Sequence, residues 1–525
     1  MTFRGAVISA LVALSLAACG STETAPARPS VGASAAPATS ASPSAKPSAA
    51  AQQKAETPNL PALKIGPDKG VVGSSFTASL DGLKPGQQVS FDWGTWDGAY
   101  STNVSAETVQ YNERKFTPKR VPLGKSAAND QGAVRATFTV PEDYGEVHDV
   151  FASVDGKDVA RGGFRIEFSA SISPAEGPIG TPVTLTVKGM SAMLFSGSTL
   201  AVRYDNAYMG LLTATTTHGT ATAKVRAAGP AGKHTFVLNA GSIPAYLNIA
   251  QSPYDFVYSH LDDKEDVQLP FTVTDDAGLP ADALDWPDAG SVASLAPDAP
   301  RTALAKQDSA GVKASLEPAS GPIRTKSTLT ATGLPANTKI DAYWVTARGN
   351  RVTPSGWALA DSPLASAQTD ASGSLSTPLE VPDDLGGWHA IKLVQGDREV
   401  GQAPFFVQRS LESVSAHKVK AGDTVTIDLK GIGWTELDNG VAMTYDNAFA
   451  GYACGFNSNG DITLKVLATG APGTHIIDLY PMVYAGRGKE KWWYWTPVLT
   501  YSNDFPALSL GYNLPAYRLA IEIVP

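Results

Sequence analysis

The residues of this sequence that could do chemistry occur mainly in one repeated pattern. Tyr-Asp-Asn-Ala is followed by an aromatic residue, a variable residue and glycine, and a Gly-x-x-Gly-x-His sequence comes later. The first copy runs from Tyr204 to His234 and the second from Tyr445 to His475, with a constant numbering offset. Self-similarity over this length indicates a duplicated unit. Aspartate, asparagine and histidine can also bind metal ions and sugars, so each type needs a separate interpretation.

The Asp-Asn pairs, Asp205-Asn206 and Asp446-Asn447, each lie between a strand that ends in tyrosine and a second strand that contains an aromatic residue. Aspartate and asparagine tolerate positive φ and bond to their own backbone, which favours a tight hairpin. The alternative is a carboxylate presented to calcium or to a sugar hydroxyl. One acidic residue per copy falls far short of the roughly six to eight oxygens that calcium needs. We therefore predict a turn.

Four of the seven histidines occupy positions that are paired between the repeats, and these are His148, His234, His389 and His475. Two or three convergent imidazoles would suit zinc. Each expected domain, however, has one such histidine, at the start of a strand just after a glycine turn. An aromatic ring at such a corner between two strands commonly bonds to the backbone. We predict structural histidines, no metal site and no cofactor.

The most site-like stretch is a run of four consecutive aromatic residues, Trp492, Trp493, Tyr494 and Trp495. Alternation along a strand would place at least one or two of them on each face. Large rigid aromatic faces suit stacking on sugar rings or anchoring a protein partner. Packing between domains is the alternative. We predict a ligand-binding role for these four residues and leave that alternative open.

Signals for catalysis are few. The sequence contains no G-x-S-x-G, HExxH or Walker-type motif. The acidic pairs Glu142/Asp143 and Asp383/Asp384 could in principle serve a glycosidase, but they lie in proline-flanked turns. The sequence contains two cysteines, Cys19 near the N-terminus and Cys454, and we expect Cys454 to be a buried small hydrophobe without a disulfide partner. We predict that the protein is not an enzyme.

The N-terminus has the features of a secretory leader. Arg4 precedes an apolar run, Ala6–Leu16, which is too short to be a stable membrane span. The run ends in Leu-Ala-Ala-Cys-Gly, and Leu16–Cys19 resembles the lipobox of bacterial lipoproteins. The resemblance implies removal of residues 1–18, a diacylglyceryl group on Cys19 and an extracytoplasmic location on a bacterial membrane. An ordinary signal peptide that happens to contain cysteine is the alternative.

Residues 19–59 form a low-complexity Ala/Ser/Pro/Thr tract, which we predict to be a disordered tether. The full sequence is acidic, with 50 Asp and Glu against 41 Lys and Arg, so its charge gives no reason to expect nucleic-acid binding. The short basic cluster Asn112–Arg120 lies beside acidic residues, and we predict that it is a solvated loop.

From Leu63 onward, short apolar and threonine-rich runs alternate with Gly, Pro, Asp and Asn, which is typical of antiparallel sandwiches. The openings Ile65–Leu83, Ile172–Met190 and Leu316–Leu334 share an apolar residue, a proline and two glycines at fixed spacing, and Ala416–Gly431 keeps part of this pattern. These openings resemble the first strands of IPT/TIG immunoglobulin-like domains. The resemblance implies a fold class and no specific activity.

We therefore predict an all-β protein of four immunoglobulin-like β-sandwiches in the order A–B–linker–A′–B′. The expected boundaries are 60–168 for A, 169–275 for B, 276–311 for the linker, 312–408 for A′ and 409–525 for B′. Domain A matches A′ through Trp93 and Trp344, with extra residues in A that we expect to form a long loop near Tyr111–Pro122. The predicted function is non-catalytic binding or adhesion to a protein or glycan partner. A structural spacer of an envelope assembly and an unrecognised enzyme are the alternatives.

Overall fold

The structure, a computed structural model, describes residues 60–104, 109–192, 199–241, 267–275, 311–349, 357–456, 458–483, 496–505, 510–514 and 516–525. The predicted leader, Cys19, the tether and the Trp492–Trp495 run lie outside these residues, and so does the connector up to residue 310. In the part of the chain that is described, no helix has the length and apolar character needed to cross a bilayer.

Sandwich A is built from two sheets that enclose one apolar core. The three-stranded sheet has the order β1-β3-β6 and the five-stranded sheet has the order β2-β8-β7-β4-β5. The strands are β1 (Lys64–Gly66), β2 (Lys69–Gly70), β3 (Ser75–Leu80), β4 (Gln88–Val104), β5 (Val109–Ala127), β6 (Val134–Thr139), β7 (Glu146–Val154) and β8 (Lys157–Ile166).

Sandwich B repeats this plan, with a three-stranded sheet β14-β11-β9 and a five-stranded sheet β10-β16-β15-β12-β13. Its strands are β9 (Ser169–Ser173), β10 (Glu176–Gly177), β11 (Pro182–Lys188), β12 (Thr199–Tyr204), β13 (Ala207–Thr213), β14 (Ala221–Arg226), β15 (Gly232–Ala240) and β16 (Val267–Val273).

Sandwich A′ has sheets β17-β19-β22 and β18-β24-β23-β20-β21, and sandwich B′ has sheets β25-β27-β30 and β26-β32-β31-β28-β29. The strands of A′ are β17 (Lys313–Glu317), β18 (Ser320–Gly321), β19 (Lys326–Thr332), β20 (Lys339–Gly349), β21 (Trp357–Gln368), β22 (Leu375–Glu380), β23 (Gly387–Gln395) and β24 (Arg398–Val407). Those of B′ are β25 (Ser410–Val414), β26 (Lys418–Lys420), β27 (Thr424–Lys430), β28 (Gly440–Tyr445), β29 (Ala448–Cys454), β30 (Ile462–Leu467), β31 (Gly473–Pro481) and β32 (Tyr517–Val524), with a short helix α1 (Tyr501–Asp504) before β32.

Alternation of residue types explains why these strands pair as they do. In β11 the side chains of Val183, Leu185 and Val187 are fully buried, while the threonines between them are half-buried on the other face. A period of two places every second side chain on one face of a strand. The same alternation recurs in β27 of B′. The prediction of an all-β chain with four immunoglobulin-like sandwiches is confirmed.

Two expectations about sandwich A are wrong. Asn112–Arg120, predicted as a solvated loop, and the long loop expected near Tyr111–Pro122 both belong to strand β5. The reason is continuous pairing with β4, which runs from Gln88–Ala127 to Val104–Val109. Several charged residues of β5 are exposed on this edge strand, and exposed charge protects a sheet edge from pairing with another chain.

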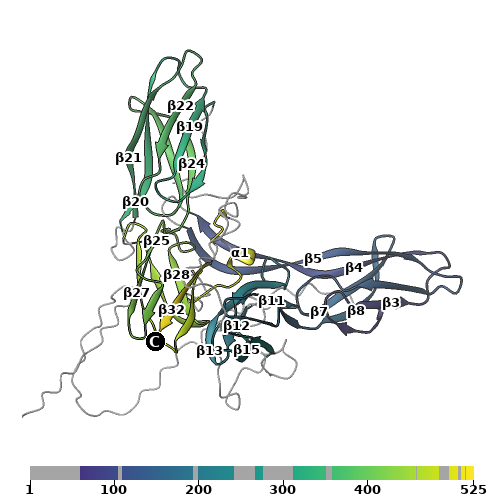
Figure 1. The fold of residues 1–525 in the computed structure, drawn as a ribbon. Helices are drawn as coiled ribbons and strands as arrows, with labels where there is room; N and C mark the ends of the chain where they lie inside the picture. Colours follow the sequence, from purple (N-terminus) through teal and green to yellow (C-terminus); the bar gives the residue numbers. More distant parts are fainter. Residues whose placement is uncertain are drawn as a thin grey trace, which may run out of the picture.

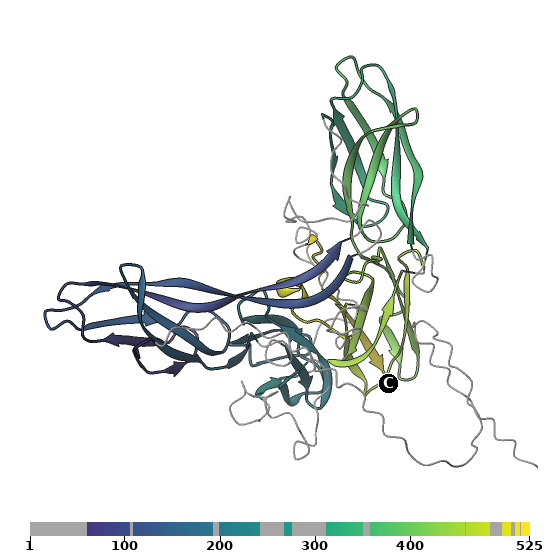
Figure 2. The same cartoon turned by 180° about the vertical axis from the view of Figure 1, so that it is seen from behind.

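The four sandwiches are arranged as two arms on a common centre (Figures 1 and 2). Sandwiches B and B′ lie side by side in the middle, and A and A′ extend from them in different directions. We call A with B the first half and A′ with B′ the second half. The hairpin of β4 and β5 runs from sandwich A back to the centre, where it reaches α1 of the second half (Figure 1). The molecule therefore has one central junction to which all four sandwiches contribute.

Candidate functional site

The Asp-Asn pairs form the hairpin turns that the sequence predicted. Asp205 has a φ of 52° and Asp446 a φ of 47°, so both adopt the left-handed conformation between two paired strands. In the first copy Asp205 accepts the amide of Thr235 at 3.0 Å through Oδ1 and contacts His234 at 2.9 Å through Oδ2. Both carboxylate oxygens therefore stabilise the corner. Asp446 does the same in the second copy.

The histidines of A and A′ are buried beside a tryptophan. His148 stacks on Trp93 with ring centroids 4.7 Å apart, and His389 stacks on Trp344 at 4.4 Å. Nδ1 of His148 lies 2.8 Å from the carbonyl of Gly94, and Nε2 lies 2.7 Å from the carbonyl four residues earlier. His389 makes the equivalent two contacts at 2.8 Å each. Both ring nitrogens of each histidine are engaged with backbone oxygens, which explains their structural role.

The histidines of B and B′ use one carboxylate and one carbonyl. Nδ1 of His475 lies 2.6 Å from Oδ2 of Asp446, and Nε2 lies 2.9 Å from the carbonyl of Ala471. The hydrogen bond to Asp446 raises the pKa of His475 above its ordinary value. Since the ring nitrogens already face oxygens, they are poorly placed to bind a metal ion. Within the described residues, no group of three or more His, Cys, Asp and Glu side chains is arranged to hold one.

The acidic pairs that could have served a glycosidase stabilise the structure instead. Oδ2 of Asp143 accepts the indole N–H of Trp93 at 2.8 Å, and Oδ2 of Asp384 accepts that of Trp344 at 2.9 Å. Both of these aspartates are buried. Glu142 accepts a hydrogen bond from the hydroxyl of Thr220 at 2.8 Å. The carboxylates are therefore bound to groups within the protein.

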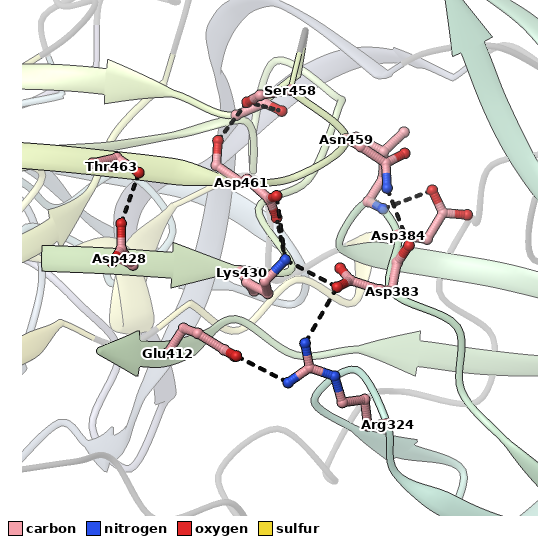
Figure 3. Close-up of polar contacts among 12 residues, drawn as sticks. Arg324, Asp383, Asp384, Glu412, Asp428, Lys430, Ser458, Asn459, Asp461 and Thr463 are labelled. Carbon is pink, nitrogen blue, oxygen red and sulfur yellow. Dashed lines mark hydrogen bonds and ion pairs between the residues drawn. The ribbon is translucent and has the colours of Figure 1, made fainter. Parts of the chain in front are cut away.

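A polar network joins A′ to B′ near Asp384 (Figure 3). Nζ of Lys430 lies between Asp383 of A′, at 2.9 Å, and Asp461 of B′, at 3.1 Å. Arg324 of A′ reaches Glu412 of B′ at 2.9 Å. The hydrogen bond to Asp383 is the main reason that the pKa of Lys430 is raised. Exposed ion pairs contribute little stability each, so this network adds little to the contact between the two domains.

A glycine contact fixes the same two domains more firmly. The amide of Gly386 donates to the carbonyl of Ile432 at 3.0 Å, and a Cβ on Gly386 would lie 1.8 Å from the carbonyl oxygen of Gly431. The first half has the same contact, because Gly145 donates to Met190 at 3.0 Å. We call this contact the glycine clasp. In each half it brings the backbones of the two sandwiches into direct contact.

The two halves meet in an apolar cluster at the centre of the molecule. The cluster contains residues from all four sandwiches: Val109, Tyr111, Leu211, Trp388, Phe406, Leu437, Val483, Val498, Tyr501, Phe505, Leu510, Tyr512 and Leu514. Helix α1 adds a polar anchor, because Asp504 accepts the amides of Thr215 at 2.8 Å and Thr216 at 2.5 Å. It also accepts the hydroxyl of Tyr100 at 3.0 Å. One carboxylate thus binds sandwiches A and B to sandwich B′.

A buried ion cluster lies where B packs on B′. Arg226 of B forms an ion pair with Asp478 of B′ and donates to the carbonyl of Leu519 at 2.7 Å. Arg518 lies 3.5 Å from the same carboxylate, and Tyr480 donates to it at 3.2 Å. Charges taken out of water are costly unless they are paired with good geometry. This cluster therefore allows one orientation of B on B′ and penalises others.

A segment of the second half also extends a sheet of the first half. Leu211 in the edge strand β13 donates to the carbonyl of Pro497 at 2.9 Å and accepts the amide of Leu499 at 2.9 Å. The segment around Val498 runs in the same direction as β13 and pairs with it at Leu211. The amide of Thr213 donates to the hydroxyl of Thr500 at 2.9 Å. Sequence reasoning missed this junction, although Arg226 stands at the end of strand β14, whose sequence is Ala-Thr-Ala-Lys-Val-Arg.

The aromatic run Trp492–Trp495 lies outside the described residues, but the segments on both sides of it are described. Val483 and Thr496 are buried, and the amide of Val498 donates to the carbonyl of Pro481 at 3.1 Å. The described residues on either side of 484–495 are therefore fixed at the junction. Cys454, expected to be buried, is half-buried at the end of β29, beside a small apolar cluster.

Comparison with known proteins gives structural likeness alone. No family model and no curated protein matches the chain. The adhesin FdeC of Escherichia coli is 15% identical over 66% of this chain and 96% of that chain, with a TM-score of 0.15. The adhesin InvE of Yersinia pseudotuberculosis is 14% identical over 50% of this chain and 66% of that one, with a TM-score of 0.15. At these scores the likeness carries no information about ligand, partner or activity.

Proposed function

We propose that the protein is a non-catalytic binding protein on the outer side of a bacterial membrane. In this proposal Cys19 carries the lipid anchor, residues 19–59 are the tether, and the four sandwiches occupy the boundaries 60–168, 169–275, 312–408 and 409–525. The support is the lipobox-like sequence together with the β-sandwich architecture. Incorporation of labelled palmitate that Cys19→Ala abolishes would test the anchor, and unchanged incorporation would contradict it.

The aromatic run Trp492, Trp493, Tyr494 and Trp495 is the proposed contact surface for a protein or glycan. The observation that carries this proposal is the fixed base of the connection in which the run lies. Buried residues on both sides and the hydrogen bond from Val498 to Pro481 hold that base on a four-domain junction. A binding segment on a rigid base loses less conformational entropy when its ligand binds.

Replacing Trp492, Trp493 and Trp495 together by alanine tests the contact surface. The soluble fragment that begins at residue 58 and its triple variant would be compared on a glycan array and in pull-downs from an envelope fraction. We expect the variant to lose the binding of the parent protein and to keep its β-rich circular dichroism spectrum and melting temperature. Unfolding of the variant would favour packing between domains instead, and retained binding would exclude the run as the contact surface.

A rigid spacer in an envelope assembly is the second candidate function. The glycine clasps and the central junction favour it, because they fix the two arms relative to each other. A spacer predicts a fixed partner that co-purifies with both the parent protein and the triple variant, together with no binding on the glycan array.

A further inference from the structure

The hairpin of sandwich A is much longer than its equivalent in A′. Strand β4 has 17 residues and β5 has 19, whereas β20 has 11 and β21 has 12. Strand β7 pairs with β4 only from Ser90 to Trp93. The pairing of β4 with β5 continues as far as Val104 and Val109. Residues 94–104 and 109–120, which we call the outer hairpin, therefore extend beyond the β7 side of their sheet as a ribbon of two strands.

A ribbon of two strands is at best marginally stable by itself in water. The order of the outer hairpin must therefore come from the surfaces on which it lies. Val109 and Tyr111 of the outer hairpin rest on the second half, where the amide of Tyr111 donates to Oε2 of Glu436 at 3.2 Å and the amide of Glu436 donates to the carbonyl of Val109 at 3.3 Å. The ring of Tyr100 lies 5.6 Å from that of Phe505 in the apolar cluster.

The middle of the outer hairpin rests on the Thr215 loop of sandwich B and on Tyr144 of sandwich A. A Cβ on Gly98 would lie 2.1 Å from the carbonyl oxygen of Thr215 and 2.2 Å from the hydroxyl of Tyr144, so only glycine permits this approach. The loop that contains Thr215 is the one whose amides bind Asp504, which also accepts the hydroxyl of Tyr100. The hairpin, the loop and helix α1 thus share one set of contacts, and losing one contact weakens the others.

We propose that the outer hairpin is a strap that closes the joint between the two halves and exists in a docked and a released state. In the docked state it covers the apolar cluster with Val109 and Tyr111, both of which are buried. In the released state sandwich A keeps its own core. None of the residues of that core lies in the outer hairpin. Release then exposes the central cluster and loosens the loop at Thr215. This inference does not depend on the proposed ligand.

Hydrogen–deuterium exchange on the mature full chain tests the strap. In the parent protein we expect the amides of the outer hairpin to exchange faster than those of β7, since release precedes unfolding of the sandwich. Tyr100→Phe removes only the hydroxyl that donates to Asp504. Losing one buried hydrogen bond to a carboxylate should raise exchange about tenfold in the outer hairpin. The amides of Thr215 and Thr216 should accelerate with it, while β7 remains unchanged.

Two further variants complete the experiment. Gly98→Ala should accelerate the same amides more strongly than Tyr100→Phe, because its Cβ collides with backbone. Lys119→Ala is the matched control, since it changes an exposed ion pair with Asp97 inside the same ribbon and should leave all these rates unchanged. The strap is excluded if the outer hairpin and β7 exchange at one common rate. It is also excluded if neither Tyr100→Phe nor Gly98→Ala alters exchange in the outer hairpin.

Discussion

The two halves of the molecule share the same internal contacts and differ on the surfaces where they meet. Both keep the stacked Trp-His pair with its aspartate, and both keep the glycine clasp. At the junction, equivalent positions have opposite environments. Leu211 is 0% exposed and its counterpart Tyr452 is 46% exposed. Arg226 is 1% exposed and its counterpart Leu467 is 56% exposed.

In the arms A and A′ it is the residue of the second half that is buried and its counterpart in the first half that is exposed. Trp388 of A′ packs in the central cluster and is 6% exposed, whereas its counterpart Val147 of A is 57% exposed. Gly387 lies where Asp438 and Tyr512 approach closely, and the first half has Glu146 at the equivalent position with nearly the same φ, 81° against 87°. The two copies thus share the contacts within a half, while the surfaces between the halves have become specialised.

The largest effect should come from breaking the specialised ion cluster. Asp478→Val introduces the residue of the equivalent position in the first half, Val237, and leaves Arg226 buried without its carboxylate. Removal of one partner from a buried ion pair costs about 3–5 kcal/mol. Urea unfolding followed by intrinsic fluorescence would measure this loss in the transition that separates B from B′.

The matched control replaces the whole cluster by the residues of the other copy. Arg226→Leu, Asp478→Val and Arg518→Gln take their types from Leu467, Val237 and Gln268. With no charge left in the contact, we expect the triple variant to recover most of the stability that Asp478→Val loses. If the triple variant is as unstable as the single one, then packing and not charge sets this interface.

An intermediate effect is expected at the shared contact. Gly386→Ala and Gly145→Ala both place a Cβ within about 2 Å of a backbone oxygen, so the backbone must move. Overpacking of this kind costs about 1–3 kcal/mol. Gly66→Ala is a suitable control, because no atom lies within 4 Å of its added Cβ. Thermal melts of the three variants would show equal losses at the two clasps if the halves are equivalent there, and unequal losses would contradict that equivalence.

The smallest effect concerns pH. Asp446 raises the pKa of His475 in the folded protein above the ordinary value of about 6.5. The associated stability is fully present below that ordinary value and is lost as pH rises through the raised folded pKa. The parent protein should therefore lose less than about 1 kcal/mol of its free energy of unfolding through His475 as the pH rises from neutral to mildly alkaline. In His475→Gln this loss should be absent, so the fall in melting temperature over the same pH range should be smaller. A fall of unchanged size in the variant would show that His475 does not cause it.

Local patterns were sufficient to predict the sandwiches but not the junction. The alternation at Val183, Leu185 and Val187 and the paired landmarks Trp93 and Trp344 depend on neighbours in the chain, so sequence reveals them. The part of strand β5 from Asn112 to Arg120 was mistaken for a loop, since charge is as typical of an edge strand as of a loop.

The junction itself depends on contacts that no local pattern encodes. The anchor at Asp504 serves Thr215 and Tyr100, which are hundreds of positions away in the chain. A short polar helix gives no sign of such partners in its own sequence. The aromatic run Trp492–Trp495 was recognisable as unusual, and its role stays a prediction.

The pairing of Leu211 with Pro497 and Leu499 has a consequence for the order of folding. The hydrogen bond between Thr213 and Thr500 joins residues 287 positions apart, and that between Tyr100 and Asp504 joins residues 404 positions apart. Chains fold from the N-terminus during synthesis, and such distant contacts close last. The edge strand β13 of sandwich B therefore stays unpaired on this side until almost the whole polypeptide has been synthesised. A chain that stops before Thr496 would keep that edge open to aggregation.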